Sequence, residues 1–219
     1  PPAPVPLSFE AIDDLIYSAR LGDIPSLKSD ITKYSTEHNV PASSIIRSAL
    51  DTEPESDGGT GACLLHWPAA NGNVELLNYL LSVLGEESTE LASFLNYRNY
   101  TGNTPLHWAA LNTHLDCVKA LVGAGADIGI KNDAGHDALF LAERADWSAD
   151  DDQDDGDEEE EIEVTANGNG NVDGEKKEDE APPTKARLVV EWLLGCEKGA
   201  GFEAPVERRD GEGGEAMEE

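Results

Sequence analysis

Apolar residues are unevenly distributed along the chain, and their distribution predicts which parts fold. Nearly all of the Leu, Ile, Val, Phe, Tyr and Trp residues lie in the segments 7–147 and 184–195. The segment between them, 148–183, contains only Ile162, Val164 and a third valine among its larger apolar residues. A packed core cannot include such a segment, so we expect it to be disordered when free.

Within the apolar part, one sequence pattern recurs. Residues 61–77 align with residues 102–118 at an offset of 41, so that Gly, Leu, His, Trp, Ala and Asn coincide. A third copy begins at Gly135, 33 residues after Gly102. A degenerate copy begins at Leu15, 91 residues before Leu106. A period of this size is typical of stacked helix pairs, and the alignment predicts four of them.

The best copy also contains the residues that start and end helices. Thr104 can cap a helix, Pro105 suits its first turn, and Gly125 can end the second helix of the pair. In the fourth copy a first helix is predicted over about 136–147 and a second over 185–194. We expect the second helix to be amphipathic, and its predicted apolar face consists of Leu188, Val189, Trp192 and Leu193.

The stretches T-G-N-T-P-L-H-W-A-A (101–110) and L-D-C-V-K-A-L-V-G-A-G-A-D (115–127) resemble the ankyrin-repeat family. The resemblance implies an all-α solenoid of about four helix-turn-helix repeats with short hairpin loops, interrupted by a disordered acidic insertion. The expected segments are a Pro-rich arm (1–7), repeats one to three with the first helix of repeat four (8–147, including a long loop at 35–60), the insertion (148–183), the second helix of repeat four (184–200) and an acidic tail (201–219).

The charge of the chain restricts its partners. With 45 Asp and Glu against 15 Lys and Arg, the net charge is −30, and residues 148–183 alone contain 16 acidic residues and two lysines. Binding to nucleic acid or to an anionic membrane requires a basic surface, so neither is expected as a direct ligand. The charge favours a basic partner, although acidic residues that serve only solubility would give the same composition.

The three cysteines, Cys63, Cys117 and Cys196, are far apart and have no metal-ligand spacing to histidines, which favours a reducing compartment. We expect no signal peptide and no membrane span. The expected location is the cytoplasm and nucleus, and the strong net charge favours a monomer.

The histidines and the acidic run are the candidates for catalytic or metal-binding chemistry. His66 and His107 occupy the same repeat position, and in ankyrin repeats this histidine hydrogen-bonds the neighbouring backbone, so we expect a structural role. The acidic residues from Asp150 to Asp157 lack the spacing of a calcium-binding loop. No nucleophile elbow or phosphate-binding glycine loop is present, so neither an enzyme nor a cofactor or metal site is expected.

Ankyrin proteins contact their partners through a concave surface of hairpin tips and first helices. Carried onto this sequence, that partner-binding surface consists of Tyr17, Arg20, Trp67, Asn71, Tyr100, Asn103, Trp108, Leu111, Asn112, Asp133, His136, Asp137 and Arg144, with Leu21, Thr60, Ala62 and Ala70 beside them. Tyr17, Trp67, Trp108 and Leu141 are equivalent in the repeats, and we expect them to form a ladder that packs inside the stack, is partly exposed to a partner, or both.

The fourth repeat, K-N-D-A-G-H-D-A-L-F-L-A-E (131–143), and the acidic segments after it resemble the fungal ankyrin-repeat chaperones dedicated to small-subunit ribosomal protein S-three. This resemblance implies that the chain binds that basic protein, through its N-terminal segment, until the protein joins the 40S subunit. The residues expected to shield the RNA-binding surface of the client are Asp150, Asp151, Asp152, Asp154, Asp155, Asp157, Glu158, Glu159, Glu160 and Glu161. A general ankyrin adaptor and a histone-type chaperone are the alternatives.

Overall fold

A computed structural model describes residues 5–85, 89–151 and 183–197 of the chain. The helices in these ranges are α1 (Phe9–Leu21), α2 (Ile24–His38), α3 (Ala42–Ser48), the short 3₁₀ helix η1 (Glu55–Asp57), α4 (His66–Asn71), α5 (Val74–Leu84), α6 (Thr89–Leu95), α7 (Pro105–Leu111), α8 (Leu115–Gly123), α9 (Ala138–Asp151) and α10 (Lys185–Glu197).

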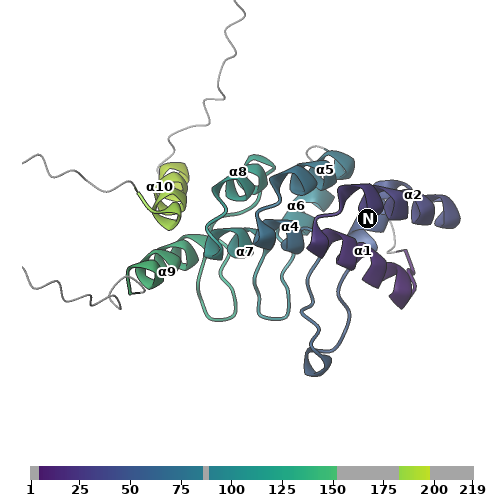
Figure 1. The fold of residues 1–219 in the computed structure, drawn as a ribbon, viewed down its shortest axis with the longest axis horizontal. Coiled ribbons are helices and arrows are strands. Elements are labelled where there is room, and N and C mark those ends of the chain that lie inside the picture. Colours follow the sequence, from purple (N-terminus) through teal and green to yellow (C-terminus); the bar gives the residue numbers. More distant parts are fainter. Residues whose placement is uncertain (1–4, 86–88, 152–182, 198–219) are drawn as a thin grey trace, which may run out of the picture.

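The helices stack in two layers, as predicted for an ankyrin solenoid. The first helices of the repeats, α1, α4, α7 and α9, lie side by side in one layer (Figure 1). The second helices pair with them as α1 with α2, α4 with α5, α7 with α8, and α9 with α10. Between repeats, the chain projects as hairpins from the edge of the first layer (Figure 1). The all-α repeat architecture predicted from the sequence is therefore confirmed.

Local sequence explains where the paired helices begin and end. The side chains of Asp23 and Asn73 accept hydrogen bonds from the N–H groups of Ser26 and Leu76, which caps α2 and α5. Gly22 and Gly72 end α1 and α4 in the left-handed region, at φ 73° and 71°. These residues fix the tight turns that set the second helix of each pair against the first.

The prediction of a long loop at residues 35–60 is wrong for much of its length. Helix α2 continues to His38, and α3 follows within the segment. Ile45 and Ile46 of α3 are fully buried, because α3 packs between α2 and α5 in the outer layer. The core of the stack therefore includes residues that the repeat alignment left outside it.

The boundaries of repeat four also differ from the prediction. Helix α9 continues to Asp151, so residues 148–151 are helical, whereas the sequence predicted disorder from 148 onward. The remainder of the acidic insertion up to 182 lies outside the described residues, as does the tail after 197. Leu188 does not belong to the buried face of α10 and is 39% exposed. The face that packs on the stack is formed by Ala186, Val189, Val190 and Leu193.

Candidate partner-binding surface

The hairpins that precede α4, α7 and α9 are joined edge to edge through their backbones. The N–H of Tyr100 donates to the carbonyl of Thr60 over 3.0 Å, and the N–H of Asp133 donates to the carbonyl of Thr101 over 3.2 Å. Gly61 allows this close approach, because a Cβ there would lie 2.5 Å from the Tyr100 ring. The hairpin tips therefore form one continuous surface beside the first helices.

His66 and His107 connect successive repeats from within. The Nδ1 atom of His66 accepts from the N–H of Cys63 at 3.2 Å, so its Nε2 carries the proton and donates to the carbonyl of Asn103 at 3.0 Å. The Nδ1 atom of His107 likewise accepts from the N–H of Thr104 at 3.1 Å, and its Nε2 donates to the carbonyl of His136 at 3.1 Å. The predicted structural role of both histidines is confirmed.

Burial holds these histidines in the neutral form. Removal from water lowers the pKa of His66 to about 4 and also lowers the pKa of His107. Neither imidazole is accessible for proton transfer or for metal binding, since both ring nitrogens are hydrogen-bonded and the side chains are buried. Their function is to fix the hairpins relative to the helices.

The predicted aromatic ladder forms in the middle of the stack but does not extend to its first member. Trp108 packs edge-on against Trp67 and His66 of the preceding repeat, with ring centroids 5.3 and 4.9 Å apart. Trp67 in turn lies beneath the guanidinium of Arg20, 3.9 Å from its ring centroid. Each tryptophan thus packs on the preceding repeat. In the described chain no repeat precedes α1, and Tyr17 is 62% exposed. Leu141, the fourth member, is buried.

The structure brings most residues of the predicted surface to the hairpins and first helices, with unequal exposure. Exposed members are Arg20, Asn71, Tyr100, Leu111, Asn112, Asp133 and Arg144, and half-buried members are Trp67, Asn103, Trp108, His136 and Asp137. Ala62 is fully buried, so its place on this surface was predicted wrongly; its carbonyl accepts from the N–H of Asp51 in the hairpin. Leu111 is 42% exposed and is the apolar side chain most available to a partner on α7.

A groove between α1 and the first hairpin was missed by the repeat alignment. It is lined by Phe9, Ile12, Ile16, Asp13 and Glu53, among others. Phe9 is mostly exposed, and the two carboxylates lie beside it. The alternation of apolar and acidic residues in F-E-A-I-D-D could have indicated it, but the other wall is formed by Asp51, Thr52 and Glu53, which lie in the segment 35–60 that the repeat alignment predicted to be a loop. The groove extends the candidate surface to the start of α1.

Two arginines on this side of the stack are already engaged by the protein. Arg98 forms an ion pair with Asp133, with 2.6 Å between Nη2 and Oδ1, and Arg20 covers Trp67. Asp13, Glu53 and Asp137 add negative charge along the same side. The described surface is therefore suited to a partner that supplies positive charge together with apolar side chains. Of the expected shielding residues, Asp150 and Asp151 lie at the end of α9, and the others lie outside the described residues.

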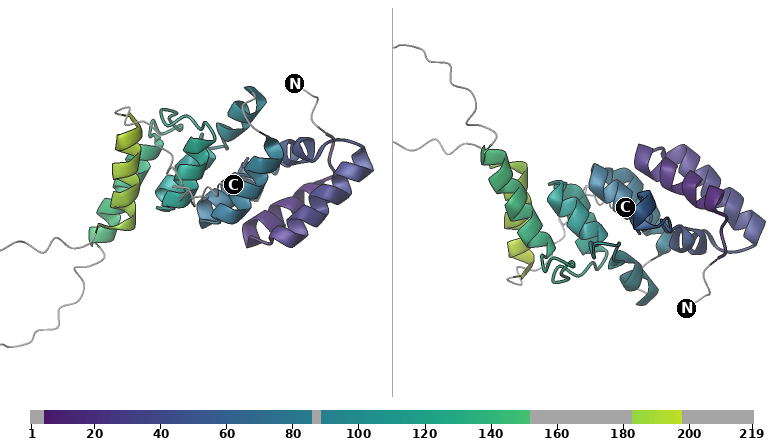
Figure 2. Two further views of the ribbon diagram at one scale, coloured as in Figure 1. Left: turned by 90° about the horizontal axis from the view of Figure 1, so that it is seen from above. Right: turned by 90° about the horizontal axis from the view of Figure 1, so that it is seen from below.

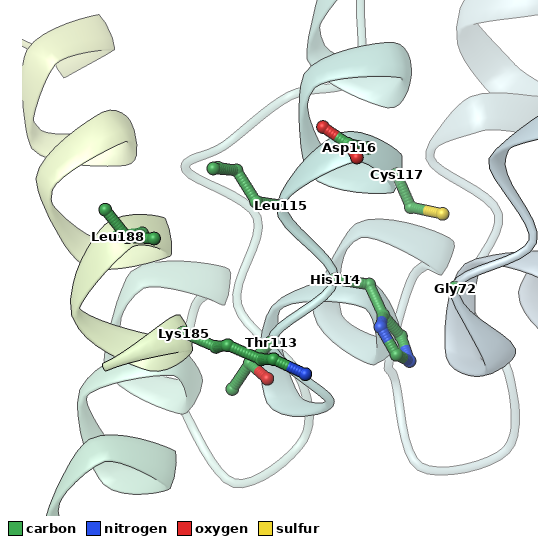
Figure 3. Close-up of a pocket in the computed structure, with 8 residues that line it drawn as sticks. All are labelled: Gly72, Thr113, His114, Leu115, Asp116, Cys117, Lys185 and Leu188. Atoms are coloured by element: carbon green, nitrogen blue, oxygen red, sulfur yellow. The ribbon is translucent and has the colours of Figure 1, made fainter. Parts of the chain in front are cut away.

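The outer layer contains a second, differently lined groove, between the starts of α8 and α10 (Figure 3). Leu188 and Lys185 line it from α10, and Thr113 and His114 line it from the other side. His114 fills the space beside Gly72, and its Nε2 lies 3.0 Å from the carbonyl oxygen of Ala70. This groove lies in the layer of second helices, away from the hairpins. Its exposed residues can therefore serve as controls for substitutions on the candidate partner-binding surface.

Within residues 5–85, 89–151 and 183–197, no three His, Cys, Asp or Glu side chains are grouped so that they could hold a metal ion. None of the helices described there is both long and apolar enough to cross a membrane.

The chain belongs to the ankyrin-repeat family. The family model for ankyrin repeats in three copies matches residues 34–132. A chain in the crystal structure of the yeast ribosomal protein Rps3 in complex with its chaperone Yar1 is 37% identical to this one, with a TM-score of 0.55, over 64% of this chain and 87% of that one.

Curated relatives agree with this assignment. The ankyrin repeat-containing protein YAR1 of Saccharomyces cerevisiae is 34% identical over 143 residues, which cover 64% of this chain and 66% of the yeast protein. Human SOWAHD, an ankyrin repeat domain-containing protein, is 36% identical over 47% of this chain and 34% of its own length. Human palmitoyltransferase ZDHHC17 is 31% identical over 51% of this chain but only 18% of its own length. The chain thus spans just under two thirds of the yeast relative and about a third or less of the two human ones.

Proposed function

We propose that this protein is a dedicated chaperone of small-subunit ribosomal protein S-three (Rps3), which it keeps soluble and shields until the client is assembled into the 40S subunit. The observation that carries the proposal is the similarity to the chain in the Rps3–Yar1 complex, which covers 87% of that chain at 37% identity. Fold alone would not suffice, because ankyrin repeats serve many partners.

The surface described above supports this proposal physically. A ribosomal protein is basic, and this surface presents Asp13 and Glu53 beside the exposed Phe9, Asp137 at the start of α9, and the exposed Leu111 at the end of α7. An amphipathic, basic helix in this surface would place its apolar side on the first helices and its cations near the carboxylates. We expect the N-terminal segment of the client to be this helix. The role is binding without catalysis, in the cytoplasm and nucleus, and one chaperone would bind each client.

The acidic segment 148–183 has a separate task in the proposal. Its 16 acidic residues would cover the RNA-binding surface of the client as a polyanion, which speeds capture and prevents binding to the wrong RNA. A contact of this kind weakens as salt rises, whereas apolar contacts in the hairpin surface do not. Capture and specificity are therefore assigned to different parts of the chain.

The first experiment compares two leucines of similar exposure on opposite layers. Leu111 is 42% exposed on α7, and Leu188 is 39% exposed on α10. We expect Leu111→Ser to weaken binding of purified yeast Rps3 at least fivefold in calorimetry. An apolar side chain that the client buries on binding contributes more than about 1 kcal/mol, and the substitution removes it. Leu188→Ser is expected to bind as the unmodified protein does. Equal effects of the two substitutions would contradict the placement of the client.

A second experiment separates the proposal from its alternatives. Every Asp and Glu in 152–182 is replaced by Asn or Gln, which preserves the length of the connection between α9 and α10. A chaperone that shields charge should bind Rps3 more weakly after this change at low salt, and the difference should shrink at higher salt. Unchanged affinity would favour a general ankyrin adaptor. Equal displacement of Rps3 by core histones would favour a histone-type chaperone.

A further inference from the structure

The first repeat has a groove on the side that faces away from the rest of the stack. On α1, Asp14, Tyr17 and Leu21 lie on one face, at spacings of three and four residues. Ile16 and Arg20 of the same helix line the other groove, beside the first hairpin, and Arg20 covers Trp67 of the next repeat. Asp14, Tyr17 and Leu21, together with residues of α2, line a groove between the two helices. Figure 2 shows α1 and α2 at one end of the stack, remote from α9 and α10, and the groove that they line belongs to that end.

This end groove combines exposed apolar side chains with carboxylates. Tyr17 and Leu21 are 62% and 64% exposed, although the outer face of a terminal repeat is normally polar. Asp14, Asp23 and Asp30 line the same groove, and Ser18 at its floor is buried. All charged residues that line the groove are acidic.

The hydrogen bonds of these carboxylates hold their positions and leave charge available. Asp14 accepts from the hydroxyl of Tyr34 at 2.9 Å, and Asp30 accepts from the hydroxyl of Ser18 at 3.5 Å. Lys33 lies near one end, where its Nζ is 3.4 Å from the Tyr34 hydroxyl, so it offsets part of the negative charge there. A single hydroxyl donor occupies only one acceptor site of a carboxylate, so further sites are free for an incoming cation.

We propose that this end groove is a second docking site for the same basic client, and that it takes a segment in which lysine or arginine residues flank an apolar side chain. The proposal rests on the proposed function. It is favoured over a second copy of this chain because two identical acidic grooves repel each other in a protein of net charge −30. Charge complementarity likewise excludes an anionic membrane or nucleic acid as the occupant.

The position of α1 makes a continuous path between the two sites. The same helix borders the groove beside the first hairpin on one side, through Phe9 and Asp13, and the end groove on the other, through Tyr17 and Leu21. A client whose helix lies on the hairpin side can therefore reach the end groove by crossing a single helix. Two linked contacts raise affinity through the high effective concentration of the second segment.

The test measures binding of purified yeast Rps3 to full-length variants by calorimetry. The apolar variant is Tyr17→Ser with Leu21→Ser, and the charge variant is Asp14→Asn with Asp30→Asn, in which the amide oxygens can still accept the bonds from Tyr34 and Ser18. The apolar variant is expected to bind at least fivefold more weakly. The charge variant is expected to bind more weakly at low salt, with a shallower dependence on salt than the unmodified protein.

Leu188→Ser in the outer layer is the matched control, and its affinity is expected to be unchanged. Circular dichroism melts verify that each variant is folded, which the high exposure of Tyr17 and Leu21 leads us to expect. Full affinity in the apolar variant, or an unaltered salt dependence in the charge variant, would overturn the end groove while Leu111→Ser still tests the proposed function. Failure of the unmodified protein to bind Rps3 would overturn both.

Discussion

The buried histidine His66 should make the stability of the fold depend on pH. Its pKa falls from the ordinary value of 6.5 to about 4 on folding, because burial disfavours the charged ring. Above pH 6.5 the ring is neutral in both states and its contribution is complete. As the pH falls from 6.5 towards 4, the unfolded chain takes up a proton that the folded protein cannot, and stability is lost. The full difference is on the order of 3 kcal/mol.

The range from pH 6.5 to 5.5 isolates this effect best, because most carboxylates stay ionised there. Linkage predicts a loss of about 1 kcal/mol from His66 over that one unit. Urea unfolding followed by tryptophan fluorescence measures it, and the comparison is with His66→Gln, which cannot titrate. The variant should be less stable at pH 6.5, because its bond to the Asn103 carbonyl is weakened, but its stability should fall less steeply as the pH is lowered. His107 titrates in the same direction in both proteins and cancels in the comparison. Identical slopes for the two proteins would refute the account of the buried ring.

Two further predictions concern the backbone and the thiols. Thr113 has φ 58° at the position where Gly22 and Gly72 follow α1 and α4. Thr113→Gly should therefore raise the free energy of unfolding by about 0.5–1 kcal/mol in urea, and a decrease would show that the turn is not strained. The cysteines differ in their exposure to solvent. Cys63 is fully buried, which raises the pKa of its thiol to about 12, whereas Cys196 is half-buried. A thiol reagent should therefore modify Cys196 in the folded protein well before Cys63, and equal rates would contradict the packing around α4.

The repeat architecture could be predicted from the sequence because the signals for it are local and recur along the chain. The Thr-Pro start of α7, the paired alanines and the glycine that ends the helix pair all act within a few residues. The role of His107 was implied by the repeat position that it shares with His66 together with the resemblance to ankyrin repeats, in which this histidine bonds the neighbouring backbone. Such local, repeated signals define the solenoid without knowledge of distant contacts.

Helix α3 could not be predicted in the same way. Its seven residues are too few for a reliable helical period, and only one copy of it exists. It is stabilised by burial of Ile45 and Ile46 between α2 and α5, which lie before and after it in the chain. Long-range packing of this kind leaves no local signature.

The candidate surface was predicted in outline, and its errors have a common cause. Tyr17 was placed on the concave side because it aligns with Trp67 and Trp108. Trp67 and Trp108 pack on the preceding repeat. In the described chain no repeat precedes α1, so the equivalent residue Tyr17 becomes part of the end groove. Alignment gives equivalent positions in the repeat, but exposure depends on the place of the repeat in the stack.

The most direct test of the central claim is calorimetric titration of the full chain with purified Rps3 at moderate salt. The account predicts saturable binding with one chaperone for each client and a Kd below about 100 nM, the range of dedicated complexes with standard-sized interfaces. Absence of binding at low salt, where electrostatic attraction is strongest, would contradict the chaperone assignment and leave an ankyrin-repeat protein with a different partner.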